Sequence, residues 1–125
     1  MLGPNIELLT LTGAAAINGT GNGMLNNITG NSGANVLNGM GGGDRLTGGA
    51  GADTFVLGLG GSNDKVVDFR ASEGDKLDLR AFGGASKATF SQLGADTVIS
   101  FATGESLTLL GVPLTDPGVK ASILW

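Results

Sequence analysis

The sequence predicts an all-β protein, built as a right-handed parallel β-roll with a C-terminal antiparallel β cap. Three observations favour this fold class. Sixteen of the 24 glycines lie between positions 13 and 61, which indicates closely spaced turns. The same stretch repeats every nine residues, and fixed periods are typical of repeat architectures. Near the C-terminus, TVISF and SLTLL alternate apolar and polar residues with the period of two that predicts strands.

The composition is that of one modest domain, and it predicts neither a nucleic-acid partner nor a membrane span. The 125 residues suffice for a single core, and 41% of them are apolar, unlike a disordered polymer. The net charge is −4 and no basic cluster occurs, so we expect no nucleic-acid partner. No apolar run approaches the ~20 residues that span a bilayer. The N-terminal MLGPNIELL lacks the features of a cleaved export signal.

Cysteine and histidine are both absent. This excludes disulfides, Cys/His zinc sites and catalytic triads that use histidine. Oxygen ligands remain, and they favour hard cations such as calcium. Pairs of Asp and Glu could act as glycosidase acids, but nearly all of them lie in the repeat or its closing segment. We therefore expect a non-catalytic module, not an enzyme.

The middle of the chain divides into four nonapeptides: GNGMLNNIT from position 21, GNSGANVLN from 30, GMGGGDRLT from 39 and GGAGADTFV from 48. Position one is always Gly. Position six is Asn or Asp, and position eight is apolar. Six loop residues need positive φ at several positions, which Gly, Asn and Asp adopt at low cost. Three strand residues follow, and the middle one points inward, giving one core side chain in nine. The position-six and position-eight residues are Asn26, Asn35, Asp44 and Asp53, and Ile28, Leu37, Leu46 and Phe55.

Two nonapeptides make one turn of a flattened coil, so loops on one edge recur every 18 residues and turns stack at about 4.8 Å. Carboxylates and loop carbonyls of neighbouring layers then converge on one ion. Calcium takes six to eight oxygen ligands, many of them backbone carbonyls. The alternative for the two position-six aspartates is an Asx turn without metal. The predicted metal-site residues of these two copies are Met40, Gly42, Asp44, Gly49, Gly51 and Asp53.

The copies are unequal. Asn26 and Asn35 are neutral, so their loops should bind calcium weakly or be capped by side-chain hydrogen bonds. A further loop, LGGSNDKVV, fits if two residues are inserted after Val56, which places Asp64 at position six and Val66 inside. Stacking then pairs Asp44 with Asp64, and Asp53 with an acid between 68 and 78. We expect one to three calcium ions.

The copy from position 48 matches G-G-x-G-x-D-x-U-x at every defined position, the calcium-binding nonapeptide of RTX proteins. Residues 8 to about 112 resemble the C-terminal RTX region of proteins exported by type I secretion, including serralysin-type proteases, lipases and epimerases. The lead-in LTLTGAAAINGTGN, the closing VVDFRASEGDKLDLRAF and the strands ADTVISF and ESLTLLGV carry the rest of the resemblance. It implies that Asp68 and Asp75 help to hold the terminal ions, with Asp78 nearby. The alternative for Asp68 and Asp78 is a solvated strand edge or a turn cap.

Three segments are expected. Residues 1–17 form N-terminal strands covering the open end of the roll, and 18–80 form the calcium-binding roll. Residues 81–125 form antiparallel capping strands and the secretion-signal region, with Phe82, Phe90 and Phe101 in the core. The terminal GVKASILW is either an uncleaved export signal or a segment that packs against the cap.

The resemblance implies a bacterial, extracellular, monomeric module that folds on calcium and supports type I (ABC) secretion and stability of a larger protein. Without metal the roll should not fold, because ordering each residue costs ~1–2 kcal/mol and few side chains enter the core. Starting in mid-pattern suggests a fragment, with a catalytic or adhesive domain upstream. The alternatives are a structural or adhesive spacer of a surface layer, which more tandem copies would favour, and a polysaccharide-contacting module like those of epimerases, which a basic or aromatic face would favour.

Overall fold

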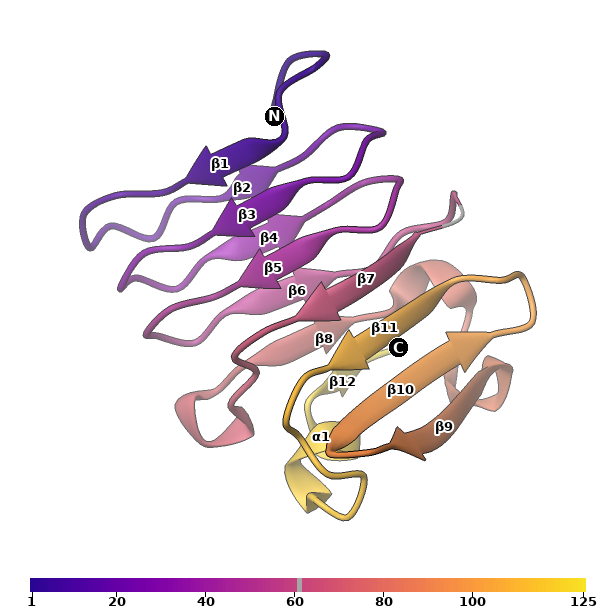
Figure 1. Cartoon of the computed structure of the whole chain (residues 1–125). Helices are drawn as coiled ribbons and strands as arrows, with labels where there is room; N and C mark the ends of the chain where they lie inside the picture. The colour runs from indigo at the N-terminus through magenta and orange to yellow at the C-terminus, as the bar shows by residue number, and fades with distance from the viewer. Residues whose placement is uncertain (61) are drawn as a thin grey trace.

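The computed structural model describes residues 1–60 and 62–125, so Gly61 of the fifth loop lies outside the described residues. The fold is nearly all β: stacked parallel turns form a β-roll, and antiparallel strands follow at its C-terminal end (Figure 1). The predicted fold class is confirmed. Among the described residues, no helix is long and apolar enough to cross a bilayer.

The described strands form two sheets on opposite sides of the roll. One sheet has the order β1-β3-β5-β7-β11-β10-β9, and the other has the order β12-β8-β6-β4-β2. The roll strands of the first sheet are β1 (Leu8–Thr10), β3 (Asn27–Thr29), β5 (Arg45–Thr47) and β7 (Asn63–Val66). Those of the second are β2 (Gly19–Thr20), β4 (Val36–Asn38), β6 (Thr54–Val56) and β8 (Lys76–Asp78).

The strand register confirms two nonapeptides per turn. Ile28 pairs with Leu46, and Leu37 pairs with Phe55, each 18 residues further along the chain. Leu46 then pairs with Val66, which is 20 residues on, so the two-residue insertion before β7 is also confirmed. Because the register is in step, each apolar side chain lies on its counterpart in the neighbouring turn.

The core of the roll is one column of apolar side chains per sheet. The middle residue of each short strand points inward, and the two columns meet between the sheets. The repeat predicts one such side chain per nonapeptide, but position six is buried as well, because it lies under the loop of the next turn. The fully buried column residues are Ile28, Leu37, Leu46, Phe55, Val66 and Leu77.

The cap continues the first sheet of the roll. Strands β9 (Ala88–Leu93) and β10 (Asp96–Phe101) are antiparallel, as predicted for this region. Strand β11 (Ser106–Leu109) is antiparallel to β10 but parallel to β7, which joins cap to roll. The aromatic side chains of the cap are buried or partly buried. Phe101 is buried, and its ring stacks on that of Phe82 with 3.8 Å between the centroids. Phe82 and Phe90 are partly buried and pack against the core.

The C-terminal segment packs back onto the roll. Helix α1 (Pro117–Ala121) buries Val119, and β12 (Ile123–Leu124) adds to β8 in the second sheet. Trp125 lies edge-on to Phe90, with 6.4 Å between ring centroids. The structure therefore places GVKASILW against the cap. Short 3-10 turns connect the elements: η1 (Ala71–Glu73), η2 (Arg80–Phe82) and η3 (Ala85–Lys87).

Replacing Leu37 by Ala should lower the free energy of unfolding by about 2–5 kcal/mol, because it leaves a cavity in a column that cannot easily collapse. The matched control is Val36→Ala on the same strand, whose side chain is exposed on the outer face. Urea denaturation in calcium measures both. Equal losses in the two variants would contradict the assigned facing of β4.

Candidate metal centre

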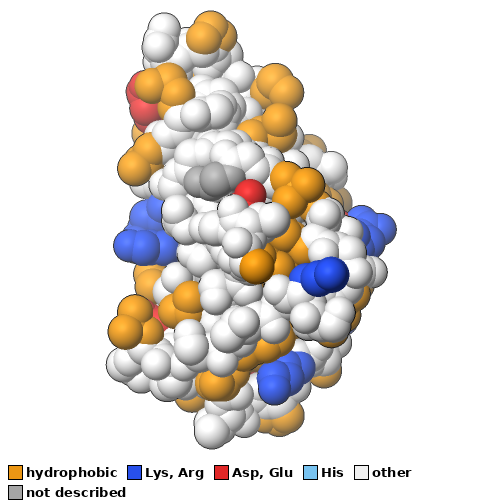
Figure 2. Space-filling model, turned by 90° about the vertical axis from the view of Figure 1, so that its right-hand side faces the viewer, with side chains coloured by type: hydrophobic (Ala, Val, Ile, Leu, Met, Phe, Trp, Pro, Cys, Tyr) orange, Lys and Arg blue, Asp and Glu red, His pale blue; other side chains and the backbone are white. Residues whose placement is uncertain are grey.

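The loops of the roll stack on two opposite edges, because each loop joins a strand of one sheet to a strand of the other (Figure 1). We call the right edge the stack of loops that precede β3, β5 and β7. The left edge is the stack that precedes β4, β6 and β8. Figure 2 looks onto the right edge and shows little red, because its position-six acids Asp44 and Asp64 are buried.

On the right edge, position six of one layer is hydrogen-bonded to position six of the next. The backbone N–H of Asn26 donates to Oδ1 of Asp44 at 2.7 Å, and the N–H of Asp44 donates to Oδ1 of Asp64 at 3.0 Å. The cap adds another acid: Glu105, nearly buried, accepts a hydrogen bond from the N–H of Gly60 at 3.1 Å. The predicted pairing of Asp44 with Asp64 is therefore present.

The left edge repeats this arrangement. The N–H of Asn35 donates to Oδ1 of Asp53 at 2.8 Å, and the N–H of Asp53 donates to Oδ1 of Asp75 at 2.9 Å. The other oxygen of Asp75 accepts from the N–H of Arg70 at 2.8 Å. Asp75 is thus the acid between 68 and 78 that stacks on Asp53.

Asp68 and Asp78 have different surroundings. Asp68 accepts hydrogen bonds from the N–H groups of Gly48 and Gly49 at 2.8 and 2.9 Å, so it caps the start of the loop stacked on it. Asp78 forms an ion pair with Arg80 at 2.6 Å, and the hydrogen bonds from Arg80 hold the pKa of Asp78 below its usual value. Asp68 therefore lies at the left edge, whereas Asp78 is engaged at a strand end.

Three position-six carboxylates each keep one buried oxygen without a partner. Oδ2 of Asp44, Asp53 and Asp64 accepts no hydrogen bond from any described residue, although these side chains are only 1–2% exposed. Burying a carboxylate oxygen without a donor is costly. A cation at these oxygens would remove that cost, which makes them the strongest candidates for metal ligands.

Burial raises the pKa of all four stacked aspartates, Asp44, Asp53, Asp64 and Asp75. For Asp64 it reaches about 7, mainly through burial and then through the neighbouring negative charge of Asp44. At Asp53, the charges of Asp75 and Asp68 act in the same direction as burial. Without a cation, burial therefore shifts all four acids toward their protonated forms.

The loop backbone differs between the acidic and the neutral copies. Met40 and Gly42 have φ of 75° and 103°, and Gly49 and Gly51 have φ of 93° and 107°. No residue of the described loops 21–26 and 30–35 has positive φ. The left-handed conformation at positions two and four is therefore confined to the copies that carry aspartate, and it falls on the four backbone positions predicted for the metal site.

The glycine at position one is required for a reason other than positive φ. None of the four adopts positive φ. Instead, a Cβ on Gly39 would collide with Oδ2 of Asp44, and a Cβ on Gly48 would collide with Oδ2 of Asp53. The glycine is required because the position-six carboxylate lies directly against its Cα.

Whether these groups fit a divalent cation depends on the backbone. Among the described residues, no three acidic side chains converge closely enough to hold a metal by themselves. Each edge instead offers a pair of stacked aspartates and left-handed loops whose carbonyls are hard oxygen donors, the donor type that calcium prefers. The residues fit a site in which two carboxylates add charge and the loop backbone supplies most ligands.

Two residues in the first copies were overlooked. Asn22 and Asn31 occupy position two and bond to the position-six asparagines of their own loops. Their signal was visible, because both copies read G-N-x-x-x-N. Glu105 was overlooked too, although it directly precedes a strand, as position six does in all four copies of the repeat.

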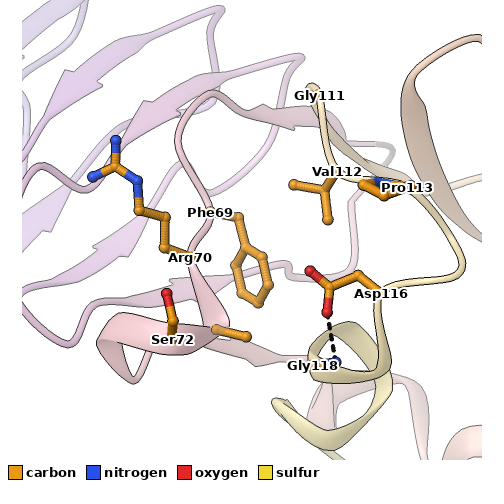
Figure 3. Close-up of a pocket in the computed structure, with 9 residues that line it drawn as sticks. Phe69, Arg70, Ser72, Gly111, Val112, Pro113, Asp116 and Gly118 are labelled. Atoms are coloured by element: carbon orange, nitrogen blue, oxygen red, sulfur yellow. Dashed lines mark hydrogen bonds between the residues drawn. The ribbon is translucent and has the colours of Figure 1, made fainter.

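Two hollows on the surface are not lined by any of the stacked acids. One, of about 480 Å³, lies between the segment after β7 and the segment before α1 (Figure 3). Its charged residues have structural partners: Arg70 points away and pairs with Glu73 at 3.0 Å, and Asp116 accepts from the N–H of Gly118 at 2.8 Å as the cap of α1. The other is lined by apolar and polar residues around Phe82 and Phe101.

Comparisons with known proteins show little beyond the fold. No protein-family model matches the chain, and no curated protein matches it. Among solved structures, the chain is similar to the solution structure of the AlgE6R3 subunit from the Azotobacter vinelandii mannuronan C5-epimerase. The identity is 24%, the match covers 98% of this chain and 86% of that one, and the TM-score is 0.37. A likeness at this level does not define a family.

In the absence of metal, the protein should be more stable at about pH 4.5 than at about pH 7.5. The pKa of Asp64 is raised from 3.8 to about 7 in the folded state, so the folded chain binds a proton that the unfolded chain has released. This contribution is complete below pH 3.8 and is lost as the pH rises through about 7. Asp44, Asp53 and Asp75 act in the same direction.

The folded fraction in buffers stripped of divalent ions, followed by circular dichroism from about pH 4.5 to about pH 7.5, measures this dependence. The control variant Asp64→Asn should weaken it, since that side chain no longer titrates while Asp44, Asp53 and Asp75 still do. Stability that increases from acid to neutral pH in metal-free buffer would contradict the assignment.

Proposed function

We propose that this chain is a calcium-dependent folding module of the RTX type. The observation that carries the proposal is the set of buried, unpartnered carboxylate oxygens on Asp44, Asp53 and Asp64. A second support is the left-handed backbone, which occurs in the loops of Asp44 and Asp53 and not in the loops of Asn26 and Asn35. Calcium, when bound, supplies positive charge and free energy of folding.

On the right edge, Asp44 and Asp64 would hold the ion together with the loop backbone around Met40 and Gly42. The carboxylates of these two layers are already linked by the hydrogen bond from the N–H of Asp44 to Asp64. The chain's contribution is to orient Oδ1 of each acid by a backbone donor and leave the second oxygen of each without one.

On the left edge, Asp53 would hold the ion through its unpartnered Oδ2, with Gly49 and Gly51 in the loop backbone, while Asp75, whose two oxygens accept backbone N–H groups, would add negative charge from the next layer. Asp68 has both oxygens on backbone N–H groups, so its role is to fix the start of the loop and add negative charge nearby. This arrangement gives one site per edge, within the expected range of one to three ions.

The ion would act as a folding ligand. It binds the folded chain and not the unfolded one, and therefore stabilises the fold by mass action. Extracellular calcium modules have dissociation constants of roughly 10⁻⁴ to 10⁻³ M. In a compartment poor in calcium the roll would stay open, and in millimolar calcium it would close.

This switch matches what the RTX resemblance implies: a segment that passes a type I export channel unfolded and folds outside the cell as part of a larger secreted protein. The export apparatus and the rest of the parent protein belong to the proposal. The non-catalytic role belongs to it as well.

Circular dichroism tests the proposal directly. In EGTA at neutral pH, the far-ultraviolet spectrum should be that of a largely unordered chain, and millimolar calcium should convert it to a β spectrum. Magnesium at the same concentration should be less effective, because it demands a stricter octahedral geometry. A spectrum unaffected by calcium would reject the proposal.

The variant Asp53→Asn should respond in opposite directions with and without calcium. It removes a buried charge, so the metal-free form should be more stable than wild type, while calcium affinity should fall about tenfold or more, or about 1.4 kcal/mol. Glu7→Gln is the matched control, because it removes an exposed carboxylate that lies outside the repeat. Calorimetric titration measures the calcium affinity, and circular dichroism in EGTA measures the folded fraction of the metal-free form. An equal loss of affinity in the control would show that only net charge matters.

A further inference from the structure

The first two loops of the repeat are clamped by asparagine side chains. In loop 30–35, Nδ2 of Asn31 donates to the carbonyls of Thr12 and Ala15 at 3.2 and 3.0 Å, and Nδ2 of Asn35 donates to the carbonyl of Ile17 at 2.6 Å. All three carbonyls belong to the preceding layer of the left edge. The amide groups therefore tie two layers together through backbone oxygens.

Loop 21–26 on the right edge has the same clamp. Nδ2 of Asn22 donates to the carbonyls of Gly3 and Ile6, both at 2.9 Å, and Nδ2 of Asn26 donates to the carbonyl of Ile6 at 3.1 Å. Within each loop the two asparagines are also joined, at 3.2 Å from Asn26 to Asn22. One motif thus occurs on both edges, one layer from the N-terminal end.

In these loops the side-chain amide nitrogens attract carbonyl oxygens, as a cation does among hard oxygen ligands. Each Nδ2 is the positive end of a dipole, and it draws carbonyls of one layer toward a side chain of the next. In loops 39–44 and 48–53 this donor is missing, because position two is Met40 or Gly49 and position six is an aspartate.

The acidic loops also lie close to carbonyls of the layer before them. The carbonyl oxygen of Met24 is 2.6 Å from the Cβ position of Gly42, and that of Asn31 lies even closer to the Cβ position of Gly49. A side chain at either position would collide with the backbone of the preceding layer. The acidic loops thus have unpartnered carboxylate oxygens, have glycines packed against carbonyls of the preceding layer, and lack the amide donor.

We propose that the pairs Asn22–Asn26 and Asn31–Asn35 are built-in, metal-free substitutes for the divalent cation, so that the first two loops bind no ion. This inference rests on the proposed function and makes it more specific. The chain then takes two ions, one between the layers of Asp44 and Asp64 and one between the layers of Asp53 and Asp75. Calcium dependence is confined to the C-terminal layers of the roll.

The test converts an asparagine clamp into an acidic loop. The double variant Asn31→Gly/Asn35→Asp removes the donors to Thr12, Ala15 and Ile17 and adds a carboxylate beside them. It should bind one calcium ion more than wild type, measured by equilibrium dialysis with calcium alone, and calcium should stabilise it by a larger factor than wild type. Asn22→Gly/Asn26→Asp repeats the exchange on the right edge, so that poor folding of one variant does not decide the result.

The matched control is Asn27→Asp, which adds a carboxylate at the exposed position next to Asn26 without altering the clamp. It should leave the number of bound ions unchanged. Wild type that binds two ions, with no gain in either double variant, would overturn the inference and leave the proposed function standing. Wild type that binds no ion would overturn both. A gain in the control as large as in the double variants would also overturn the inference, because charge alone would then account for it.

Discussion

The structure depends on like residues being stacked on like residues. Parallel pairing in a fixed register places each side chain on its counterpart one turn away, which lets leucine stack on phenylalanine in the core and forces aspartate onto aspartate at the edges. The same geometry therefore produces both favourable and unfavourable contributions to the free energy of folding. Strands of about three residues contribute one inward side chain each. The free energy gained per turn by burying apolar side chains is therefore small compared with the cost of two stacked, buried acids.

Each acid in the stack is partly compensated by the backbone. A backbone N–H of one layer donates to one carboxylate oxygen of the next, and this hydrogen bond recurs on both edges at 2.7–3.0 Å. It fixes the orientation of the carboxylate and leaves its second oxygen buried. Protonation and cation binding are the two ways to satisfy that oxygen. When no metal is bound, the cost of burying it raises the pKa values of Asp44, Asp53 and Asp64.

The period of nine was enough to predict the strands, the register and the stacked acids, because these follow from residues at fixed spacing. The pairing of Asp44 with Asp64 required only the insertion of two residues, which Val66 revealed by its apolar character. The sequence could not show that β11 turns back to lie parallel to β7, since that contact joins segments far apart in the chain. It also could not show why position one is glycine, because the close approach of Asp44 to Gly39 is a property of the folded loop.

The order of the copies has a physical consequence. Asn26 and Asn35 precede Asp44 and Asp53, so each pair of stacked acids has a neutral layer on its N-terminal side. A third acid in each stack would add another like charge one strand spacing away, where Coulomb repulsion is barely screened. Asparagine keeps the backbone hydrogen bond of the stack and supplies its own donor to the layer beyond. The roll thereby limits its charge to two acids per stack in the repeat loops. The asparagine hydrogen bonds also hold both edges of the coil at the same level of the stack, so that neither sheet can separate without opening a loop on each side.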